Sequence, residues 1–514
     1  MTSITVYDGA NTIGGTKIFV ENTVGQVFFD FGTNFAKYSK YYAEFLSERS
    51  GRGIYDLIKL NMIPKLNIYR SDLIPADLNI SAYPKLSIDA VLLSHAHLDH
   101  CGNIALLDEK IPIIASPLTI AILKATRDVS RGSMGSEISY FTPREPFDDD
   151  TRILLTKRKT PYQGRNFICT ERMSEELMAF MSDRPGSESK QTKDFDPGKM
   201  CDMKDHELPY KIEAYEVDHS LYGATGYVMR GDSTIVYTGD IRLHGMHKED
   251  SKNFIKHGKD ASILITEGTR SIASDDYANV SETVVFETCL ETIEFAKGLV
   301  ISDFSAKNFE RLETFANIAE KTSRELIVTP KDAYMLHALE CADGVCRLQD
   351  LKIYRELKRG RQKWEKLVIL DKWGENYVDP AEISKNPENY ILCFSLYDLK
   401  HLLDMNIEDG CYIYSSSEAI SEEHSFDFVR LCRWLEMLGL RICGLKLIEE
   451  SGEIVPKFVK GYHASGHASM DALRWMIEQI DPDIVIPVHT LSKVWFEENF
   501  ENTVVLHDGD SHHL

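Results

Sequence analysis

The stretch S-H-A-H-L-D-H-C-G, residues 94–102, contains three histidines and one aspartate within six consecutive positions. It directly follows the apolar run D-A-V-L-L at 89–93, which has the composition of a buried strand. Side chains alternate along an extended backbone, so His95 and His97 point to one side, and the next turn brings Asp99 and His100 to a neighbouring point. Imidazole nitrogens and carboxylate oxygens bind divalent ions such as Zn²⁺. The stretch predicts two adjacent metal sites rather than a plain solvent-exposed loop.

Three further residues stand where apolar strands end. His219 closes A-Y-E-V-D-H, Asp240 closes T-I-V-Y-T-G-D, and His489 closes D-I-V-I-P-V-H. Taken singly, each is a structural histidine or aspartate. Taken together they complete two ligand sets, which are His95, His97 and His219 for one ion, Asp99, His100 and His489 for the other, and Asp240 as a bridge. Such a set leaves an open position for water, as in catalytic zinc sites, and Mn²⁺ is the alternative ion.

Hydrophobic residues follow two different patterns along the chain. Up to about residue 270, short strand patterns such as Q-V-F-F-D-F-G at 26–32 dominate. From about 271 to 444, apolar runs alternate with amphipathic stretches such as 308–321, which is typical of a parallel sheet with helices. The runs expected to be strands there are G-L-V-I-S-D-F at 298–304, R-E-L-I-V-T-P at 324–330, E-K-L-V-I-L-D at 365–371, N-Y-I-L-C-F-S-L at 389–396 and G-C-Y-I-Y-S-S-S at 410–417. The segment 183–207 has two Pro-Gly pairs and predicts an exposed insertion or a disordered loop.

Composition limits the class of protein. Of 514 residues, 43% are apolar, and 58 Lys and Arg face 80 Asp and Glu, which gives a net charge of −22. These values exclude a fibrous or wholly disordered chain, and no apolar run approaches the ~20 residues of a membrane span. The ten cysteines include no C-x-x-C pair and predict free thiols in a reducing cytoplasm. The acidic balance argues against a basic surface that coats nucleic acid, but not against a nuclease that handles phosphates in one metal-lined cleft.

The order H-x-H-x-D-H, followed by a histidine and an aspartate, resembles that of the metallo-β-lactamase fold family. Three motifs resemble those of its β-CASP branch, which processes nucleic acids. L-I-T-E-G-T-R supplies Glu267 as the acidic first motif of that branch, H-A-S-G-H-A-S supplies His467 as the second, and I-P-V-H-T supplies His489 as the third. Within the branch, the chain looks ribonuclease J-like and related to the pre-mRNA 3′-end-cleaving endonuclease.

The resemblance implies an α/β fold with a definite division into domains. An αββα metallo-β-lactamase sandwich would form from residues 1–270 and 445–514, and an inserted α/β β-CASP cap would form from 271–444. The substrate would lie in the cleft between them. The implied activity is metal-dependent hydrolysis of RNA phosphodiester bonds, by 5′ exonuclease or endonuclease cleavage or both.

The resemblance also implies roles for individual residues. The nucleophile would be a hydroxide between two metal ions, because a water held there has its pKa lowered from about 15.7 towards ~7. Asp99, Glu267 and His467 are the implied catalytic residues, with His467 giving a proton to the leaving oxygen and Glu267 orienting it. Asp218, beside His219, is either a partner of that ligand or a solvent-facing carboxylate.

Several residues could hold substrate phosphates. Ser465, Gly466 and Ser469 open a predicted helix, whose free backbone N–H groups suit an anion. Lys307, Asn308, Ser415 and Ser416 follow predicted strands of the 271–444 unit, where α/β sheets commonly bind ligands. The plain alternative is that all seven are ordinary loop and helix-capping residues.

Three other functions remain as alternatives to a ribonuclease. They are a DNA nuclease of the same branch, a metallo-hydrolase for small esters or thioesters, and a non-catalytic RNA-binding scaffold. RNA is favoured because RNA-processing members of the branch resemble one another in having histidine at the third motif, as here at His489. The expected partner is RNA, with no membrane association and with homo-oligomerisation open, and the metal identity and the RNA target are open as well.

Overall fold

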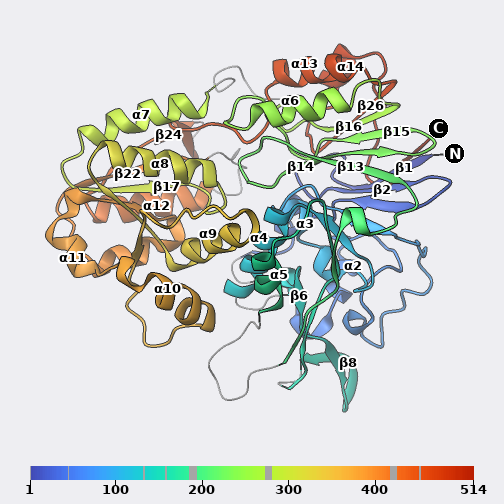
Figure 1. Cartoon of the computed structure of the whole chain (residues 1–514), viewed down its shortest axis with the longest axis horizontal. Helices are drawn as coiled ribbons and strands as arrows, with labels where there is room; N and C mark the ends of the chain where they lie inside the picture. The colour runs from blue at the N-terminus through green and yellow to red at the C-terminus, as the bar shows by residue number, and fades with distance from the viewer. Residues whose placement is uncertain are drawn as a thin grey trace.

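The computed structural model describes residues 2–43, 46–130, 134–156, 159–183, 194–271, 280–416, 425–450 and 453–514. It has two parts that lie side by side in Figure 1, a two-sheet sandwich that carries both chain termini and a second α/β unit. We call the second unit, whose described residues lie between 281 and 458, the cap. None of the described helices combines the length and the apolarity that crossing a membrane requires.

The sandwich consists of two sheets packed face to face. In spatial order the larger sheet has β12 (Met200–Asp202), β10 (Phe167–Cys169), β5 (Ile113–Ala115), β4 (Ala90–Leu92), β3 (Gln26–Phe29), β2 (Lys17–Glu21), β1 (Ser3–Asp8) and β27 (Ser511–His513). The smaller sheet has β13 (Lys211–Glu216), β14 (Thr225–Arg230), β15 (Thr234–Tyr237), β16 (Ile263–Glu267) and β26 (Ile484–Val488). Buried residues of both sheets, such as Phe29 and Tyr237, form one core between them. β26 pairs with β16 in parallel, so the end of the chain completes the smaller sheet.

Helices cover the outer faces of both sheets, which gives the αββα layering expected from the resemblance (Figure 1). One outer layer has α6 (Lys248–His257), α13 (Met470–Ile480) and α14 (Val494–Asn499), and the other has α1 (Phe35–Ser39), α2 (Tyr55–Lys59), α3 (Leu98–Cys101), α4 (Pro117–Val129) and α5 (Glu175–Ser182). Apolar residues of the first layer, such as Phe254 and Met476, pack onto the smaller sheet.

The cap is built on a seven-stranded parallel sheet. In spatial order it has β20 (Tyr377–Val378), β19 (Lys352–Tyr354), β18 (Glu325–Val328), β21 (Tyr390–Cys393), β17 (Leu299–Asp303), β22 (Gly410–Tyr414) and β23 (Arg441–Cys443). Its helices are α7 (Glu282–Glu294), α8 (Phe309–Lys321), α9 (Pro330–Asp343), α10 (Asp371–Trp373), α11 (Pro380–Lys385) and α12 (Ser425–Met437). The strands predicted at 298–304, 324–330, 389–396 and 410–417 and the helix predicted at 308–321 are therefore confirmed within the described residues.

Three expectations about local structure need correction. The run at 365–371 is not a strand, because Trp364–Leu370 forms a wide π-type helix in which Trp364 packs against Tyr334 of α9. The segment 183–207 is not wholly an irregular insertion. Its residues 184–193 lie outside the described part, but β12 extends the larger sheet and β11 (Phe195–Asp196) pairs with β9 (Tyr162–Gly164). Finally, the hairpin of β24 (Leu445–Glu450) and β25 (Glu453–Phe458) packs on the core of the cap, so the chain leaves the cap later than residue 445.

The cap contacts the sandwich mainly through α9, which lies along α4. Apolar residues of both helices belong to one continuous core. At the edge of this contact the Tyr334 hydroxyl donates a hydrogen bond to Asp128 of α4 at 2.8 Å. The two parts are thus joined by a shared apolar core.

Candidate metal centre

Seven histidines and aspartates from four separate chain segments meet at one edge of the sandwich. His95 and His97 follow β4, while Asp99 and His100 belong to α3, the short helix that comes next. His219, Asp240 and His489 follow β13, β15 and β26 of the smaller sheet. The meeting point therefore depends on where strands of both sheets end, and segments almost 400 residues apart contribute to it.

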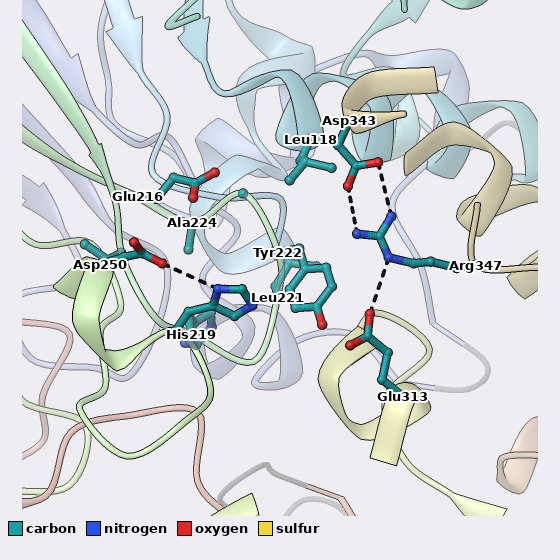
Figure 2. Close-up of a pocket in the computed structure, with 13 residues that line it drawn as sticks. Leu118, Glu216, His219, Leu221, Tyr222, Ala224, Asp250, Glu313, Asp343 and Arg347 are labelled. Atoms are coloured by element: carbon teal, nitrogen blue, oxygen red, sulfur yellow. Dashed lines mark hydrogen bonds and ion pairs between the residues drawn. The ribbon is translucent and has the colours of Figure 1, made fainter. Parts of the chain in front are cut away.

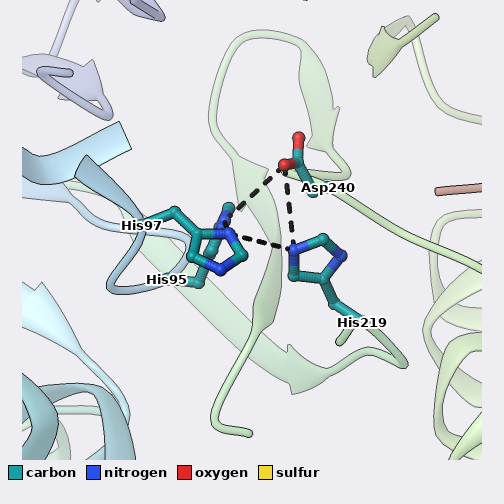
Figure 3. Close-up of side chains that lie close together, drawn as sticks. All are labelled: His95, His97, His219 and Asp240. Atoms are coloured by element: carbon teal, nitrogen blue, oxygen red, sulfur yellow. Dashed lines mark hydrogen bonds and ion pairs between the residues drawn. The ribbon is translucent and has the colours of Figure 1, made fainter. Parts of the chain in front are cut away.

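The first cluster contains three imidazoles and one carboxylate, turned toward one another in Figure 3. His97 Nδ1 lies 2.9 Å from His95 Nε2 and 3.2 Å from His219 Nε2. The Asp240 Oδ2 atom lies 3.6 Å from His95 Nε2 and 3.9 Å from His219 Nε2. Four donor atoms at such mutual distances can surround one small cation.

The second cluster contains Asp99, His100 and His489. Asp99 Oδ2 lies 3.2 Å from His489 Nε2 and 3.7 Å from His100 Nε2. Asp240 faces this cluster as well, with Oδ2 3.2 Å from His100 Nε2 and Oδ1 3.8 Å from His489 Nε2. The carboxylate of Asp240 thus lies between the two clusters.

The ring nitrogens on the far side of four imidazoles are held by hydrogen-bond partners. His95 Nδ1 lies 3.0 Å from the Ser94 hydroxyl, and His219 Nδ1 donates to the Gly466 carbonyl at 2.6 Å. His100 Nδ1 donates to Asp30 Oδ2 at 2.7 Å, and His489 Nδ1 lies 2.9 Å from the Thr269 hydroxyl. Such partners fix ring orientation and leave the other nitrogen for a metal ion.

The donor set fits divalent metal ions. His100 Nε2 and Asp240 Oδ1 are buried and make no hydrogen bond, although both face the cluster. Burial and the neighbouring imidazoles hold the pKa values of His95 and His97 well below their usual range, and burial lowers the pKa of His219 to about 4. Neutral imidazole is the form that binds metal. An ion bound between the two clusters would give these two buried atoms the partner that they lack.

Beside the clusters lies a histidine–glutamate pair. His467 Nδ1 lies 2.9 Å from Glu267 Oε2 and 3.1 Å from Oε1, and it is 3.9 Å from Asp240 Oδ2. Glu267 also accepts hydrogen bonds from the backbone N–H groups of Ile241 and Thr269. Burial opposes the charged imidazole, but the carboxylates of Glu267 and Asp240 outweigh it and raise the pKa of His467 to about 9. The pair can therefore hold a proton next to the clusters.

The residues predicted to contact phosphate lie near the centre but are engaged within the protein. Lys307 Nζ donates to the Ala96 carbonyl at 2.7 Å, between His95 and His97 in the chain. Asn308 caps α8, and the buried Ser415 hydroxyl donates to the Tyr462 carbonyl. Ser469 caps α13, the Gly466 and Ser465 carbonyls accept hydrogen bonds, and the Ser416 carbonyl accepts one from His463. Their observed contacts are structural, and a phosphate role stays a prediction.

Sequence reasoning missed the residues that hold the ligands in place. Asp30 accepts hydrogen bonds from His100 Nδ1, the Ser94 hydroxyl and the Tyr237 hydroxyl, at 2.7, 2.7 and 2.5 Å. It ends an apolar strand in F-F-D-F-G, and the same signal identified Asp240. Thr269 and Gly466 had no comparable signal, because single hydroxyls and glycines in loops are common.

A cavity of about 310 Å³ reaches from His219 to the seam between the sandwich and the cap (Figure 2). Tyr222 stands between its two ends, and Arg347 pairs with Asp343 at 2.7 Å and with Glu313 at 3.4 Å. Four carboxylates line it, namely those of Glu216, Asp250, Glu313 and Asp343. This excess of negative charge makes the cavity unsuited to a phosphate group.

Comparisons with known proteins agree with the fold. Residues 67–152 match the model of the metallo-beta-lactamase superfamily. Ribonuclease J 2 of Staphylococcus aureus (strain MRSA252) is 19% identical over 434 residues, which cover 83% of this chain and 63% of that protein. Ribonuclease J of Sinorhizobium meliloti is 23% identical over 431 residues, which cover 81% of this chain and 60% of that protein. The chain therefore matches somewhat less than two thirds of the length of these relatives.

One solved structure is similar over the full length of both chains. It is the crystal structure of a protein of unknown function from Enterococcus faecalis V583, with a TM-score of 0.67 and 22% identity, covering 100% of each chain. At this level of identity the likeness shows a shared fold. The chain is thus similar to the metallo-beta-lactamase superfamily over residues 67–152 and to ribonucleases J over most of its own length.

Proposed function

We propose that the protein is a metal-dependent ribonuclease that hydrolyses RNA phosphodiester bonds at the His–Asp centre. The observation that carries the proposal is the convergence of seven histidines and aspartates with the His467–Glu267 pair at their side. Two divalent ions, Zn²⁺ or Mn²⁺, would be held by the two clusters with Asp240 between them. Bound there, such ions supply a nucleophilic hydroxide at neutral pH and stabilise charge on the phosphate.

The protein groups divide the remaining work. His467 carries the proton that the leaving oxygen needs, and Glu267 holds the His467 ring through Nδ1, so the proton on Nε2 can face the substrate. The His467 side chain is 17% exposed, whereas those of His95 and Asp240 are at most 2% exposed. His467 is therefore the more accessible group. Lys307, held against the Ala96 carbonyl, adds positive charge beside the centre, where a phosphate would gain from it.

The position of the cap favours a polymeric substrate over a small ester. It presents the carboxyl ends of a parallel sheet, where α/β proteins commonly bind ligands, to the side of the sandwich that bears the metal residues. Lys307, which follows β17, makes that link directly. The similarity to ribonucleases J supports RNA as the polymer, and the histidine at 489 favours RNA over DNA within the branch.

Cleavage of a 5′-labelled single-stranded RNA tests the proposal. The RNA is offered with a 5′-phosphate, 5′-triphosphate or 5′-hydroxyl, with the metal-loaded protein and with Asp240→Asn as control. A labelled mononucleotide as the first product indicates 5′ exonuclease cleavage, and longer labelled fragments indicate endonuclease cleavage. Intact RNA in all three forms, with two metal ions bound per chain, would rule the proposal out.

A further inference from the structure

A buried arginine, Arg242, joins the cap to the loops of the metal centre. It lies two residues after Asp240, and its side chain is 0% exposed. Its Nε donates to Asp218 Oδ1 at 2.9 Å, and its Nη2 pairs with Glu310 of α8. Its Nη1 lies 3.6 Å from Glu282 Oε1 of α7. One guanidinium thus contacts carboxylates from the sandwich and from two helices of the cap.

On the sandwich side, Arg242 contacts both loops that complete the centre. Its backbone N–H donates to the carbonyl of Asp218, the residue before the ligand His219, at 2.8 Å. Its Nη1 donates to the Ser465 carbonyl at 3.4 Å, which also accepts from His244 Nε2 at 3.0 Å. The next carbonyl, that of Gly466, accepts from His219 Nδ1. Arg242 is therefore bonded to the residues that precede His219 and His467.

On the cap side, the two glutamates are fixed by contacts of their own. Glu310 Oε1 accepts from the Met246 backbone N–H at 2.7 Å, and Glu282 forms a two-pronged pair with Arg311 at 2.9 Å for each bond. Arg311 in turn donates to the Ser415 hydroxyl, after β22, at 2.6 Å. The chain of contacts therefore runs from the cap sheet through two helices to Arg242.

Because these charges are buried, each of them depends on its partners staying in place. The side chains of Arg242, Asp218 and Glu310 are all 0% exposed, and a buried charge is tolerated only when its partners are in place. If the cap helices moved away, Arg242 would keep only Asp218 as a carboxylate partner. The conformation of the loops before His219 and His467 is thus tied to the position of the cap.

We propose that Arg242 is a positioning residue through which the cap helices hold the His219 and His467 loops in their working arrangement. This inference rests on the proposed function, because the catalytic roles of His219 and His467 are part of that function. Glu310 is the sharper test, since it belongs to the cap. In the part of the chain that the structure describes, its carboxylate pairs with Arg242 and the Met246 backbone, and not with any of the seven residues of the metal centre. Arg242→Lys keeps the charge but loses the planar fork that reaches several partners at once.

The first measurement is hydrogen exchange of the segment 463–469, made without RNA. The Ala468 amide, which donates to the Ile241 carbonyl at 2.7 Å, reports directly on this loop. In Glu310→Gln and Arg242→Lys we expect exchange there to be roughly 10-fold faster or more, because the opening of the loop costs less. The matched control is Glu365→Gln, a buried cap glutamate paired with Arg361 at 3.1 Å and Lys358 at 2.7 Å. It should leave exchange of 463–469 at the wild-type rate even if it lowers Tm.

The second measurement separates positioning from stability. For Glu310→Gln we expect kcat on RNA to fall by roughly 10- to 100-fold at an almost unchanged KM, because small misplacement of reacting groups costs that much. The kcat is expressed per metal-loaded chain, so that any loss of metal through the His219 loop is not counted as misplacement of His467. Wild-type exchange in 463–469, or a kcat loss that equals the loss of folded protein, would overturn the inference. Faster exchange in the variants, together with a wild-type protein that leaves RNA intact, would instead overturn the proposed function and keep the positioning role.

Discussion

At the scale of single residues, four of the five imidazoles in the clusters have contacts on both sides of the ring. One imidazole nitrogen faces the cluster while the other meets a fixed partner, as His100 does between Asp240 and Asp30. The nitrogen that faces the cluster would bind a metal ion, and the nitrogen that is hydrogen-bonded on the far side fixes the direction of the ring. Removing a residue of the cluster and removing a far-side hydrogen-bond partner should therefore have different effects on metal binding.

His467→Ala should abolish turnover while leaving the metals bound. His467 belongs to none of the groups of side chains placed to hold an ion, and it is the group assigned to carry the proton. General acid catalysis contributes about 10²–10⁴-fold, so kcat on RNA should fall by that factor. A phosphodiester with a nitrophenolate leaving group, which needs no proton, should lose much less. Elemental analysis is the check, and loss of a metal ion from this variant would make His467 a ligand instead.

Asp30→Asn should weaken metal binding without removing a ligand. The variant keeps the size of the side chain but loses the charge that holds His100 Nδ1 and the Tyr237 hydroxyl. Changes to such supporting partners cost about 10–100-fold in metal affinity, and we expect a loss in that range from competition with a chelator. Asp128→Asn, a buried acid of α4 bonded to Tyr334, is the control and should retain wild-type affinity. Equal affinity in wild type and Asp30→Asn would show that Asp30 does not support the centre.

At the scale of elements, the centre exists because strand ends and one short helix are packed without spare room. Gly32 follows β3 and lies against the turn of α3, so that an added Cβ would be 1.6 Å from the Asp99 carbonyl oxygen. A Cβ added at Gly14 would also be too close, at 2.7 Å from Asp99 Cβ. The position of Asp99 and His100 is therefore set by the backbone of the neighbouring loops.

Gly32→Ala should displace α3 and with it both ligands. The new methyl group meets backbone that has no room to move, and overpacking of this kind costs about 1–3 kcal/mol or more. We expect a lower Tm and fewer metal ions per folded chain. Gly360→Ala is the matched control, because an added Cβ there meets nothing within 4 Å. A Gly32→Ala protein with wild-type metal content would contradict the packing described for α3.

Many of the strands and helices could be predicted from the sequence, and the predictions that failed did so for physical reasons. Residues 298–304 and 308–321 have strong apolar periodicity and fold as predicted, and His95, His219, Asp240 and His489 each follow a strand that is visible in the sequence. The run at 365–371 failed because Val, Ile and Leu favour strands only weakly, and packing of Trp364 against α9 determines its helix. Asp30 and Arg242 were missed because their roles arise from contacts across more than 60 residues, such as Asp30 with His100 and Arg242 with Glu310.

At the scale of the whole molecule, the centre lies where the sandwich meets the cap. The cap reaches it through Lys307, which touches the loop between His95 and His97, and through the contacts of Arg242. The net charge of −22 means that a polyanion would be held by few local contacts, so binding should depend only weakly on salt. A long substrate therefore depends on the centre itself for recognition.

RNA should be cleaved with a higher kcat/KM than DNA of the same sequence. The expectation rests on the likeness to ribonucleases J and on the histidine at position 489, which faces Asp99 at 3.2 Å. The physical difference between the polymers is the 2′-hydroxyl, which offers a hydrogen-bond donor and acceptor. Matched single strands with the same metal and salt decide it. Equal or faster cleavage of DNA would make the protein a DNA nuclease or a non-selective one.

The most direct test of metal-dependent RNA hydrolysis at this centre is a titration of metal into the stripped protein, followed by RNA cleavage at each step. We expect no cleavage by the stripped chain and an activity that rises to its maximum at two Zn²⁺ or Mn²⁺ ions per folded chain. Asp240→Asn, which lacks the carboxylate between the two clusters, should bind fewer ions and lose at least about 100-fold in activity. Full RNA cleavage by the stripped protein, or none by a chain that holds two ions, would contradict the assignment.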